Sequence, residues 1–507
     1  MLRHANAVTA IAAQVAHFNK ARKPFRIYHG STNSTRPAQF RVDETIDASQ
    51  LSHVLAINTT TKTALVEPNV PMDRLVQTTL THGLIPPVVM EFPGITAGGG
   101  FSGTSGESSS FKYGFFEDTV NWVEIVLGTG EVVSASKTIN ADLFHGAASG
   151  FGTMGVITLL ELRLIDSKPC VALTYHRVGS VREAIQKLEE VTSDENDYVD
   201  GILFAPDRGV ICVGRLIDIP DDGVRIQQFS RATDPWFYLH ASDVISKSKQ
   251  PWTEAIPIVD YLFRYDRGGF WVGSFAFKYF MCPFNRFTRW VLDRFLHTRA
   301  MYHALHQSGL SQRYVIQDVG IPYSAAEEFI KYLDESFGYY PLWLCPLRRD
   351  PGSKKSTFSD FVAHGESSGP QTLLNIGIWG MGSTQLDKFV EINRNLEDKV
   401  REFKGKKWLY AHTYYTEEEF WRIYDRKAYD SLRATYGASY LPNVYDKVGV
   451  SLRISTGQSW MTWVSRVFWG IWPLRGLYGL FHAAMGGDYL LQRASGRKRN
   501  SSDSRKV

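Results

Sequence analysis

The sequence from Ile95 to Gly114 reads ITAGGGFSGTSGESSSFKYG. It belongs to a glycine-rich region, because 13 of the 62 residues from Gly94 to Gly155 are glycine. Glycine and small hydroxyl residues let a bulky polar ligand approach the main chain and offer it bare N–H groups. The stretch therefore predicts a backbone cradle for an anionic group such as a pyrophosphate.

Two segments formally match the dinucleotide-binding pattern GxGxxG, namely Gly98–Gly103 and Gly150–Gly155. A Rossmann fingerprint follows a strand and opens a helix. The second segment has a predicted helix before it and a strand after it, and we expect the first to lie in a loop without helical period. Neither predicts a Rossmann site. Together with Gly30–Thr35 they form three loops of one chemistry, which is more than ordinary glycine turns explain.

Hydrophobic periodicity around these loops predicts a mixed α+β chain. In the first third we expect strands over 64–70, 120–127, 131–133 and 156–165, and helices over 7–18, 71–82 and 142–148. Beyond residue 166 we expect helices over 181–191, 325–337, 384–403 and 416–436, and a strand over 373–379.

Aromatic residues are distributed unevenly. Residues 1–165 hold 13 of the 67 aromatic side chains, and residues 166–507 hold the other 54. Aromatic side chains build deep apolar pockets, whereas a glycine- and serine-rich backbone admits a polar ligand. The first third is therefore predicted to hold a cofactor, and the remainder to hold an apolar ligand. A length of 507 residues allows two or three domains.

The net charge of +4 conceals a strongly basic tail. Residues 493–507 carry +5, so the rest of the chain is close to neutral. A near-neutral body argues against nucleic acid as the main partner. The cysteines are far apart in the sequence and show no metal-ligand spacing, so we expect buried free thiols in a reducing compartment. These cysteines are Cys170, Cys212, Cys282 and Cys345.

The glycine loops carry a resemblance to a known family. Gly30–Arg36, Ile95–Ser110, Lys112–Gly114, Asp142–Phe144 and Gly152–Gly155 resemble the FAD domain of the vanillyl-alcohol-oxidase superfamily. Gly106–Gly114 is more specific and resembles the delta-24 sterol reductases, which include the 24-dehydrocholesterol reductases and the plant Diminuto/Dwarf proteins. That similarity extends through Pro341–Pro346, Asn375–Gly377, Trp408–Ala411, Glu418–Trp421 and Val444–Lys447, and covers roughly residues 20–450.

The resemblance implies an α+β flavoprotein with a two-part FAD-binding domain over residues 1–165. An α+β substrate cap over 166–455 would follow, and then a hydrophobic helical extension with the basic tail over 456–507. It also implies FAD as the cofactor and NADPH as the electron donor. By this comparison we expect the chain to depart from the animal enzymes at both ends, without their long N-terminal membrane anchor and with an added segment beyond about 455.

By position, three loops would bind FAD. The residues implied are Gly30, Ser31, Thr32, Asn33, Ser34, Thr96, Gly98, Gly99, Gly100, Gly103, Thr104, Ser105, Gly106, Ser108, Gly152, Gly155 and Val156. Some relatives attach FAD covalently through a histidine that follows a glycine pair in the first loop. Here His29 precedes Gly30, so we expect non-covalent FAD.

Reduction of an isolated alkene requires a proton on one carbon and a hydride on the other. Candidate acids and cation-stabilising side chains are Tyr410, His412, Tyr414 and Glu419. If 410–415 is a strand, the first three share one face. Each is equally well explained as a core residue. Asp266-Arg267 is better explained as a structural ion pair, and Glu124 as a buried hydrogen-bonding residue.

The segment Trp460–Leu491 contains eight aromatic residues, including four of the 13 tryptophans, and is interrupted by Arg466, Pro473 and Arg475. Tryptophans with interspersed arginines favour a helix pair in the headgroup region of a membrane, and the basic tail adds attraction to an anionic leaflet. A spanning helix and a soluble helix packed on the cap are the alternatives.

The prediction is an FAD-dependent reductase that uses NADPH to saturate a delta-24-type double bond in a sterol or a related isoprenoid lipid, at the cytoplasmic face of the endoplasmic reticulum. A second hypothesis keeps the fold and reverses the electron flow, giving an FAD-linked oxidase or dehydrogenase that tailors a secondary metabolite with O2. A third is a flavin-free lipid-binding protein, against which the intact glycine and serine loops argue.

Overall fold

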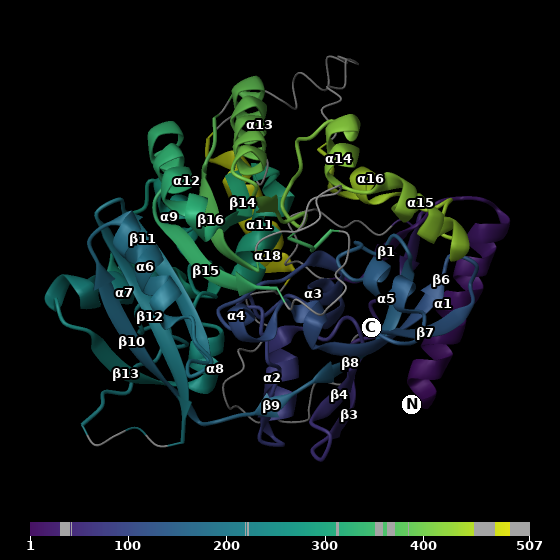
Figure 1. The fold of residues 1–507 in the computed structure, drawn as a ribbon, viewed down its shortest axis with the longest axis horizontal. Coiled ribbons are helices and arrows are strands. Elements are labelled where there is room, and N and C mark those ends of the chain that lie inside the picture. The colour runs from purple at the N-terminus through teal and green to yellow at the C-terminus, as the bar shows by residue number, and fades with distance from the viewer. Residues whose placement is uncertain are drawn as a thin grey trace.

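The structure is a computed structural model that describes residues 1–30, 41, 43–218, 220, 223–310, 314–349, 358–361, 371–383, 385–450 and 472–486. Within these residues the chain forms two large antiparallel sheets that lie side by side (Figure 1). One sheet has the strand order β3-β4-β8-β6-β7. Its strands are β3 (Val54–Asn58), β4 (Thr63–Val66), β6 (Val120–Leu127), β7 (Val132–Ser136) and β8 (Gly155–Arg163).

Short pairings and helices complete the first part of the molecule. β1 (Arg26–Tyr28) pairs in parallel with β2 (Thr45–Asp47), and β5 (Leu84–Ile85) pairs with β9 (Ile165–Asp166). The helices are α1 (Leu2–Lys20), α2 (Met72–Leu80), α3 (Ala97–Gly103), α4 (Ser110–Tyr113), the 3-10 helix η1 (Phe116–Thr119) and α5 (Ala141–Ala147). β6, β8 and α2 lie where periodicity predicted them.

The prediction of a loop at Gly98–Gly103 was wrong, because this segment forms α3. The Thr96 hydroxyl caps the helix by accepting a hydrogen bond from the Gly99 amide at 3.2 Å. Phe101 is fully buried and its ring lies 5.5 Å from that of Phe144 on α5. Packing of one aromatic residue and a threonine cap therefore overcome the low helix propensity of the glycines.

The second sheet has the strand order β13-β10-β12-β11-β15-β16-β14-β17 within the described residues. Its strands are β10 (Cys170–Val178), β11 (Tyr198–Ala205), β12 (Arg208–Ile217), β13 (Trp252–Pro257), β14 (Tyr314–Pro322), β15 (Leu342–Arg348), β16 (Thr372–Met381) and β17 (Lys406–Lys407). The alternation of these strands with helices along the chain gives an α+β fold, as predicted.

The helices described after residue 166 are α6 (Val181–Val191), α7 (Phe237–Lys247), α8 (Ile258–Leu262), α9 (Gly273–Tyr279), α10 (Arg286–Leu292), η2 (Asp293–Phe295), α11 (Thr298–Ser308), α12 (Tyr323–Ser336), α13 (Leu386–Glu402), α14 (Glu417–Ile423), α15 (Arg426–Thr435), α16 (Val444–Val448) and α18 (Leu474–Met485). Of these, α15 packs against α5 of the first part. α6 and α12 cover one face of the second sheet through a buried aliphatic cluster.

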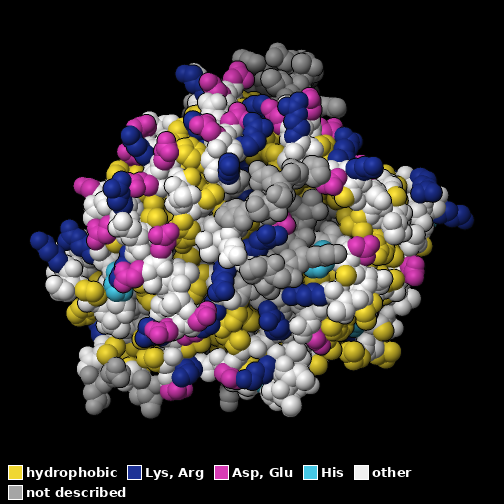
Figure 2. Space-filling model, in the orientation of Figure 1, with side chains coloured by type: hydrophobic (Ala, Val, Ile, Leu, Met, Phe, Trp, Pro, Cys, Tyr) yellow, Lys and Arg dark blue, Asp and Glu magenta, His cyan; other side chains and the backbone are white. Residues whose placement is uncertain are grey.

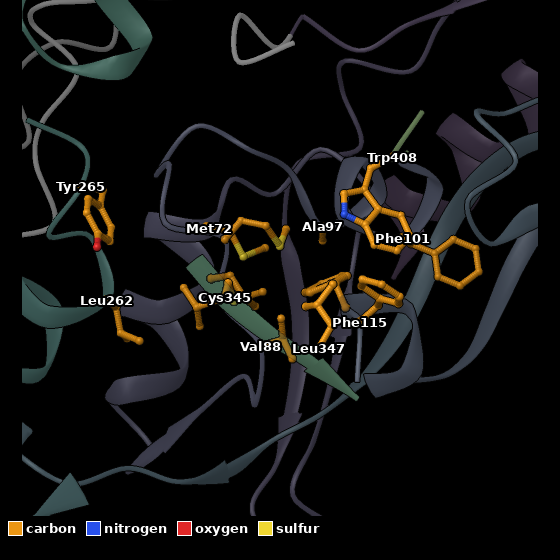
Figure 3. Packing of buried hydrophobic residues seen from close by; sticks show 14 of the residues in the cluster. Met72, Val88, Ala97, Phe101, Phe115, Leu262, Tyr265, Cys345, Leu347 and Trp408 are labelled. Carbon is orange, nitrogen blue, oxygen red and sulfur yellow. The ribbon is translucent and has the colours of Figure 1, made fainter. Parts of the chain in front are cut away.

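The other face of the second sheet joins the core of the first part. Side chains alternate along β15, so that Leu342 and Leu344 face α6 and α12 while Cys345 and Leu347 face the first part. Figure 3 shows Cys345 and Leu347 close to Val88 and Phe115. One hydrophobic core therefore spans both sheets and fixes their relative position. The four cysteines are free thiols; Cys212 and Cys345 are buried and the other two are partly buried.

Two predictions of secondary structure between residues 410 and 436 are wrong. Residues 416–436 form two helices, α14 and α15, because the Asp425 side chain accepts a hydrogen bond from the Ala428 amide and starts a new helix. Residues 410–415 are not a strand, since β17 ends at Lys407 and the chain then turns. Thr413 makes only an isolated bridge with Gly449. The period-two reasoning that placed three side chains on one face therefore fails.

α18 is the described part of the C-terminal segment. It packs closely on α11, where a Cβ on Gly479 would lie 2.4 Å from the Ala304 carbonyl oxygen. No helix among the described residues is long and apolar enough to cross a membrane. The rest of the segment Trp460–Leu491, apart from 472–486, and the basic tail lie outside the described residues.

The surface of the body carries both signs of charge. Figure 2 shows Lys and Arg side chains interspersed with Asp and Glu side chains on the face that it presents. This mixture is what the near-neutral composition of residues 1–492 predicts.

Candidate active site

A cavity of about 460 Å³ lies between the two parts of the molecule. The first part contributes the end of β1, the loops around α3 and the glycines that precede β8. The second part contributes side chains of β14, β15 and β16 and one face of α11. α3 lies between the two sheets, so the predicted cradle borders this space (Figure 1).

Most of the predicted cofactor residues line the cavity. They are Thr96, Gly98, Gly99, Gly103, Thr104, Ser105, Gly106, Gly152 and Gly155. A Cβ on Gly98 would lie 2.6 Å from the Pro68 Cβ, so this glycine allows close packing of the cradle on the fold. A Cβ on Gly103 would meet no atom within 4 Å and would project into open space. The backbone amides of Ser105 and Gly106 donate to no residue that the structure describes.

These features fit a dinucleotide phosphate, which needs bare amide donors and room beside the main chain. Two cationic side chains also line the cavity, namely Lys447 and Arg26. The Lys447 ammonium donates hydrogen bonds to the carbonyls of Phe151 and Gly152 at 2.7 and 3.2 Å. Lys447 therefore sits on the third glycine loop, where it can balance phosphate charge. Sequence reasoning included it in a matching stretch without giving it this role.

The other predicted cofactor residues have different positions. Gly100 packs against Met90 and Phe116 instead of lining the cavity. Ser108 and Val156 are buried. Gly30 follows His29, which does line the cavity and whose pKa is lowered by burial and by the Lys447 ammonium. Ser31, Thr32, Asn33 and Ser34 lie outside the described residues.

Aromatic side chains form the apolar wall of the cavity. Trp343, Trp379 and Phe270 line it. The ring centroid of Phe270 lies 5.4 Å from that of Trp343 and 4.4 Å from that of Trp379. Phe92 and Tyr302 extend the wall, with centroids 5.9 Å apart. This wall comes mostly from the second part, as the uneven distribution of aromatic residues predicted.

Asp318 is a buried carboxyl group on the cavity wall. Its Oδ2 accepts a hydrogen bond from Trp379 Nε1 at 3.1 Å, and its Oδ1 accepts one from Asn375 Nδ2 at 3.4 Å. Burial raises the pKa of Asp318 to about 7, although these hydrogen bonds and one with Tyr410 oppose the shift. Sequence reasoning missed this residue, and its one sequence signal is an acidic side chain within a β-prone run.

Two more carboxyl groups line the same cavity. Burial is the main cause that raises the pKa of Glu91 to about 8, against the attraction of Arg264, whose Nη2 lies 2.9 Å from Glu91 Oε1. Burial also raises the pKa of Glu107 well above its ordinary value, and the Glu91 carboxyl adds to this. Arg264 is itself held by Asp200 at 2.9 Å. Glu107 belongs to the glycine-rich stretch Ile95–Gly114, which predicted a backbone cradle but no acidic group in the cavity.

Of the four predicted catalytic residues, Tyr410 lines the cavity. Its pKa is raised well above the ordinary value, by burial first and then by Asp318. His412 is partly buried and its carbonyl accepts from Gln317 and Lys407. Tyr414 packs on Phe389. These two and Glu419 are not among the side chains that line the cavity.

Glu419 has a structural role at the start of α14. It completes a capping box with Thr416 and accepts a hydrogen bond from Arg394 at 2.8 Å. Two other polar groups also have structural roles. Arg267 forms an ion pair with Asp293 at 2.8 Å. Asp266 accepts hydrogen bonds from His297 and Thr298. Both residues therefore have the structural role that was expected, but with these partners.

Glu124 is hydrogen-bonded, as predicted, but it is partly buried and not fully buried. Its Oε1 accepts from Thr158 Oγ1 at 2.6 Å. It also lies 3.2 Å from His4 Nε2, which ties α1 to the first sheet.

Comparison with known proteins agrees with this geometry. Residues 3–136 match the family model described as an FAD binding domain. The chain is 30% identical over 433 residues to a delta(24)-sterol reductase homologue of Caenorhabditis elegans, covering 80% of this chain and 78% of the nematode protein. It is 28% identical over 404 residues to the human delta(24)-sterol reductase (78% and 76%) and over 432 residues to the Arabidopsis thaliana delta(24)-sterol reductase (78% and 74%).

Proposed function

The chain belongs to the delta(24)-sterol reductase family of FAD-dependent oxidoreductases, and on that premise we propose that it saturates an isolated double bond in the side chain of a sterol or a related isoprenoid lipid. The observation that carries the proposal is the shared cavity. A glycine cradle suited to FAD and an aromatic wall suited to a hydrocarbon face the same space, which also contains buried carboxyl groups.

Each part of the cavity has a task in this reaction. When bound and reduced, FAD supplies a hydride to the alkene. The amides of Ser105 and Gly106, with the Lys447 ammonium, would hold its pyrophosphate. Trp343, Trp379 and Phe270 bind the hydrocarbon and exclude water from it, at about 25 cal/mol per Å² of apolar surface buried. The same low polarity keeps nearby carboxyl groups protonated.

The reaction needs an electron donor, and the identity of that donor rests on the resemblance alone. Saturation of an alkene consumes two electrons, and the resemblance to delta-24 sterol reductases implies NADPH as their source. The alternative is an FAD-linked oxidase or dehydrogenase, in which the substrate reduces FAD and O2 removes the electrons. Both reactions use the same glycine cradle and the same aromatic wall.

Anaerobic mixing separates these hypotheses. We expect NADPH to bleach the flavin absorbance of the purified protein, and a delta-24 sterol to restore it. Flavin that stays oxidised with NADPH but is bleached by substrate alone would favour the oxidase. Protein that shows no flavin spectrum and takes up no added FAD would instead favour a lipid-binding protein without redox chemistry.

We also propose that the body docks on an anionic membrane surface, at the cytoplasmic face of the endoplasmic reticulum. Two short helices support this: the side chains of Phe287, Trp290 and Val291 on α10 and of Phe481 and Met485 on α18 are 51–72% exposed. α18 adjoins the end of α9, where Trp472 Nε1 donates to the Tyr279 carbonyl and Gly476 lies against Tyr279, and α10 follows α9 after a short connection.

The basic charge of this surface favours an anionic membrane as its partner. Neither Gly273–Leu292 nor Leu474–Gly486 contains an acidic residue, whereas Arg286, Arg289 and Arg475 are basic. Apolar side chains among arginines suit the headgroup region of an anionic bilayer. α18 packs on α11, and α11 lines the cavity through Met301 and Leu305, so docking here would place the cavity near the lipid source.

Sedimentation with vesicles of phosphatidylcholine and phosphatidylserine tests the docking surface. The double variant Phe287→Glu/Trp290→Glu should bind at least about tenfold more weakly than the wild type, because two apolar side chains lose their burial in the interface. Ile139→Glu, at a 62% exposed residue of the first part, is the matched control and should bind normally. Equal vesicle binding by all three proteins, or a dimer that only the double variant dissociates, would contradict the proposal.

A further inference from the structure

Asp318 is a carboxyl group on the cavity wall, and no cationic side chain among the described residues pairs with it. We propose that Asp318 is the acid that protonates the alkene, an inference that rests on the reductase function proposed above. Asp318 lies on β14, on the wall that the second part contributes, while the glycine cradle belongs to the first part. An alkene held between these walls has the acid and the cofactor site on different sides.

The hydrogen bonds that hold the Asp318 carboxyl group in the described part of the chain come from neutral donors. Asn375 Oδ1 accepts a hydrogen bond from Trp408 Nε1 at 2.7 Å, which orients the amide so that its NH2 group points to Asp318. Trp379 Nε1 donates to the other carboxyl oxygen, and Tyr410 makes a further hydrogen bond. Gly377 leaves the necessary room, since a Cβ there would lie 3.0 Å from Asp318 Oδ1.

This environment keeps a proton on Asp318 near neutral pH. Burial disfavours the carboxylate and raises the pKa of Asp318 to about 7, and no cation among the residues that the structure describes opposes this. The other titratable groups that act on this part of the site are Glu107, Tyr410 and Tyr302, all of which are neutral or negative. A general acid works best when its pKa is close to the working pH.

The neighbouring acids are less suitable. Glu91 Oε1 lies 2.9 Å from the Arg264 guanidinium, which attracts the carboxylate form and so opposes the effect of burial on the pKa of Glu91. The Glu107 carboxyl accepts a hydrogen bond from the Glu91 amide and is also attracted by Arg264. Tyr410, the acid expected from the sequence, has a pKa raised above that of ordinary tyrosine, so it is a weaker acid than Asp318. We assign Tyr410 the role of a positioning residue for Asp318.

One proton and one hydride together saturate the double bond. The O–H bond of the Asp318 carboxyl group breaks, and its proton forms a C–H bond at one alkene carbon with the electron pair of the π bond. The other carbon accepts the hydride that the reduced cofactor supplies, so that the substrate gains two electrons. The resulting carboxylate recovers a proton from solvent after the product leaves.

Asp318→Asn tests the assignment, because an amide has almost the same shape and no acidic proton. FAD content and anaerobic bleaching by NADPH should stay within about twofold of the wild type. Reoxidation of the reduced protein by substrate should slow by a factor of about 10²–10⁴. Infrared difference spectra of the wild type minus the variant should show the C=O stretch of one protonated carboxyl group at pH 6. Asp318→Glu should recover part of the rate.

Two controls complete the experiment. Tyr410→Phe should slow reoxidation by no more than about tenfold and displace its pH profile, as expected for a positioning residue. In the wild type the reoxidation rate should be highest below pH 7 and fall above it, because the acid must be protonated. A wild-type rate for Asp318→Asn, or a wild-type rate that is constant from pH 6 to 9, would overturn this inference alone. Failure of the wild type to reduce any alkene would overturn the proposed function as well.

Discussion

Replacement of Gly103 by valine should remove FAD from the protein without unfolding it. Gly103 is the last residue of α3 and lines the cavity, and a Cβ at this position would meet no protein atom within 4 Å. The valine side chain therefore fits the protein but occupies space that the cofactor needs. We expect FAD affinity to fall by at least about 100-fold, since an overlap with the ligand also displaces the amides that bind it.

Equilibrium titration of the apoprotein with FAD, followed by flavin fluorescence, measures this loss. Far-ultraviolet circular dichroism should show the same fold for both proteins. Gly179→Val is the matched control: it lies in the turn before α6, away from the cavity, and its Cβ would make an ordinary 3.5 Å contact with the Glu183 side chain. If Gly103→Val binds FAD as tightly as the wild type, the cradle is not the cofactor site.

Arg264→Met should destabilise the protein by about 3–5 kcal/mol. Arg264 is 1% exposed, and its guanidinium lies 2.9 Å from carboxyl oxygens of both Glu91 and Asp200. It also stacks on Tyr261, with 4.2 Å from the guanidinium carbon to the ring centroid. Methionine fills a similar volume but leaves two acidic groups in a buried site without their cation.

Urea denaturation of the apoproteins at pH 7, with transitions followed by tryptophan fluorescence, gives the change in the free energy of unfolding. Arg182→Met is the matched control, because Arg182 pairs with Glu327 on the surface with both side chains largely exposed. Exposed pairs contribute about 0–1 kcal/mol. A loss below about 1 kcal/mol for Arg264→Met would show that Glu91 and Asp200 do not depend on this cation.

Local patterns predicted the elements that local interactions determine. Val120–Leu127 is a β-prone run and forms β6 with the same bounds. Val181–Val191 forms α6 with the same bounds, because the Ser180 side chain caps an amphipathic helix. α3 could not be predicted in this way, since its stability depends on contact between Phe101 and Phe144, which are distant in sequence.

The site shows the same division. The glycines of the cradle were predictable because the requirement for bare backbone lies in one stretch of sequence. Asp318 was not, because burial in the folded protein raises its pKa and the side chains that hold it, Asn375 and Trp379, lie on the neighbouring strand β16. Lys447 reaches the loop at Gly152 from nearly three hundred residues away in the chain. Tyr410 was selected for its chemistry, although the strand that was expected to orient it does not form.

We propose that this FAD-dependent oxidoreductase reduces an alkene in a lipid side chain. Mass spectrometry of a panel of sterols and isoprenoid lipids, incubated with the purified protein, FAD and NADPH, tests it most directly. We predict that sterols with a delta-24 double bond gain two hydrogens, and that sterols with a saturated side chain are unchanged. A panel in which no alkene gains hydrogen, or in which a substrate loses two hydrogens while O2 is consumed, would contradict the claim.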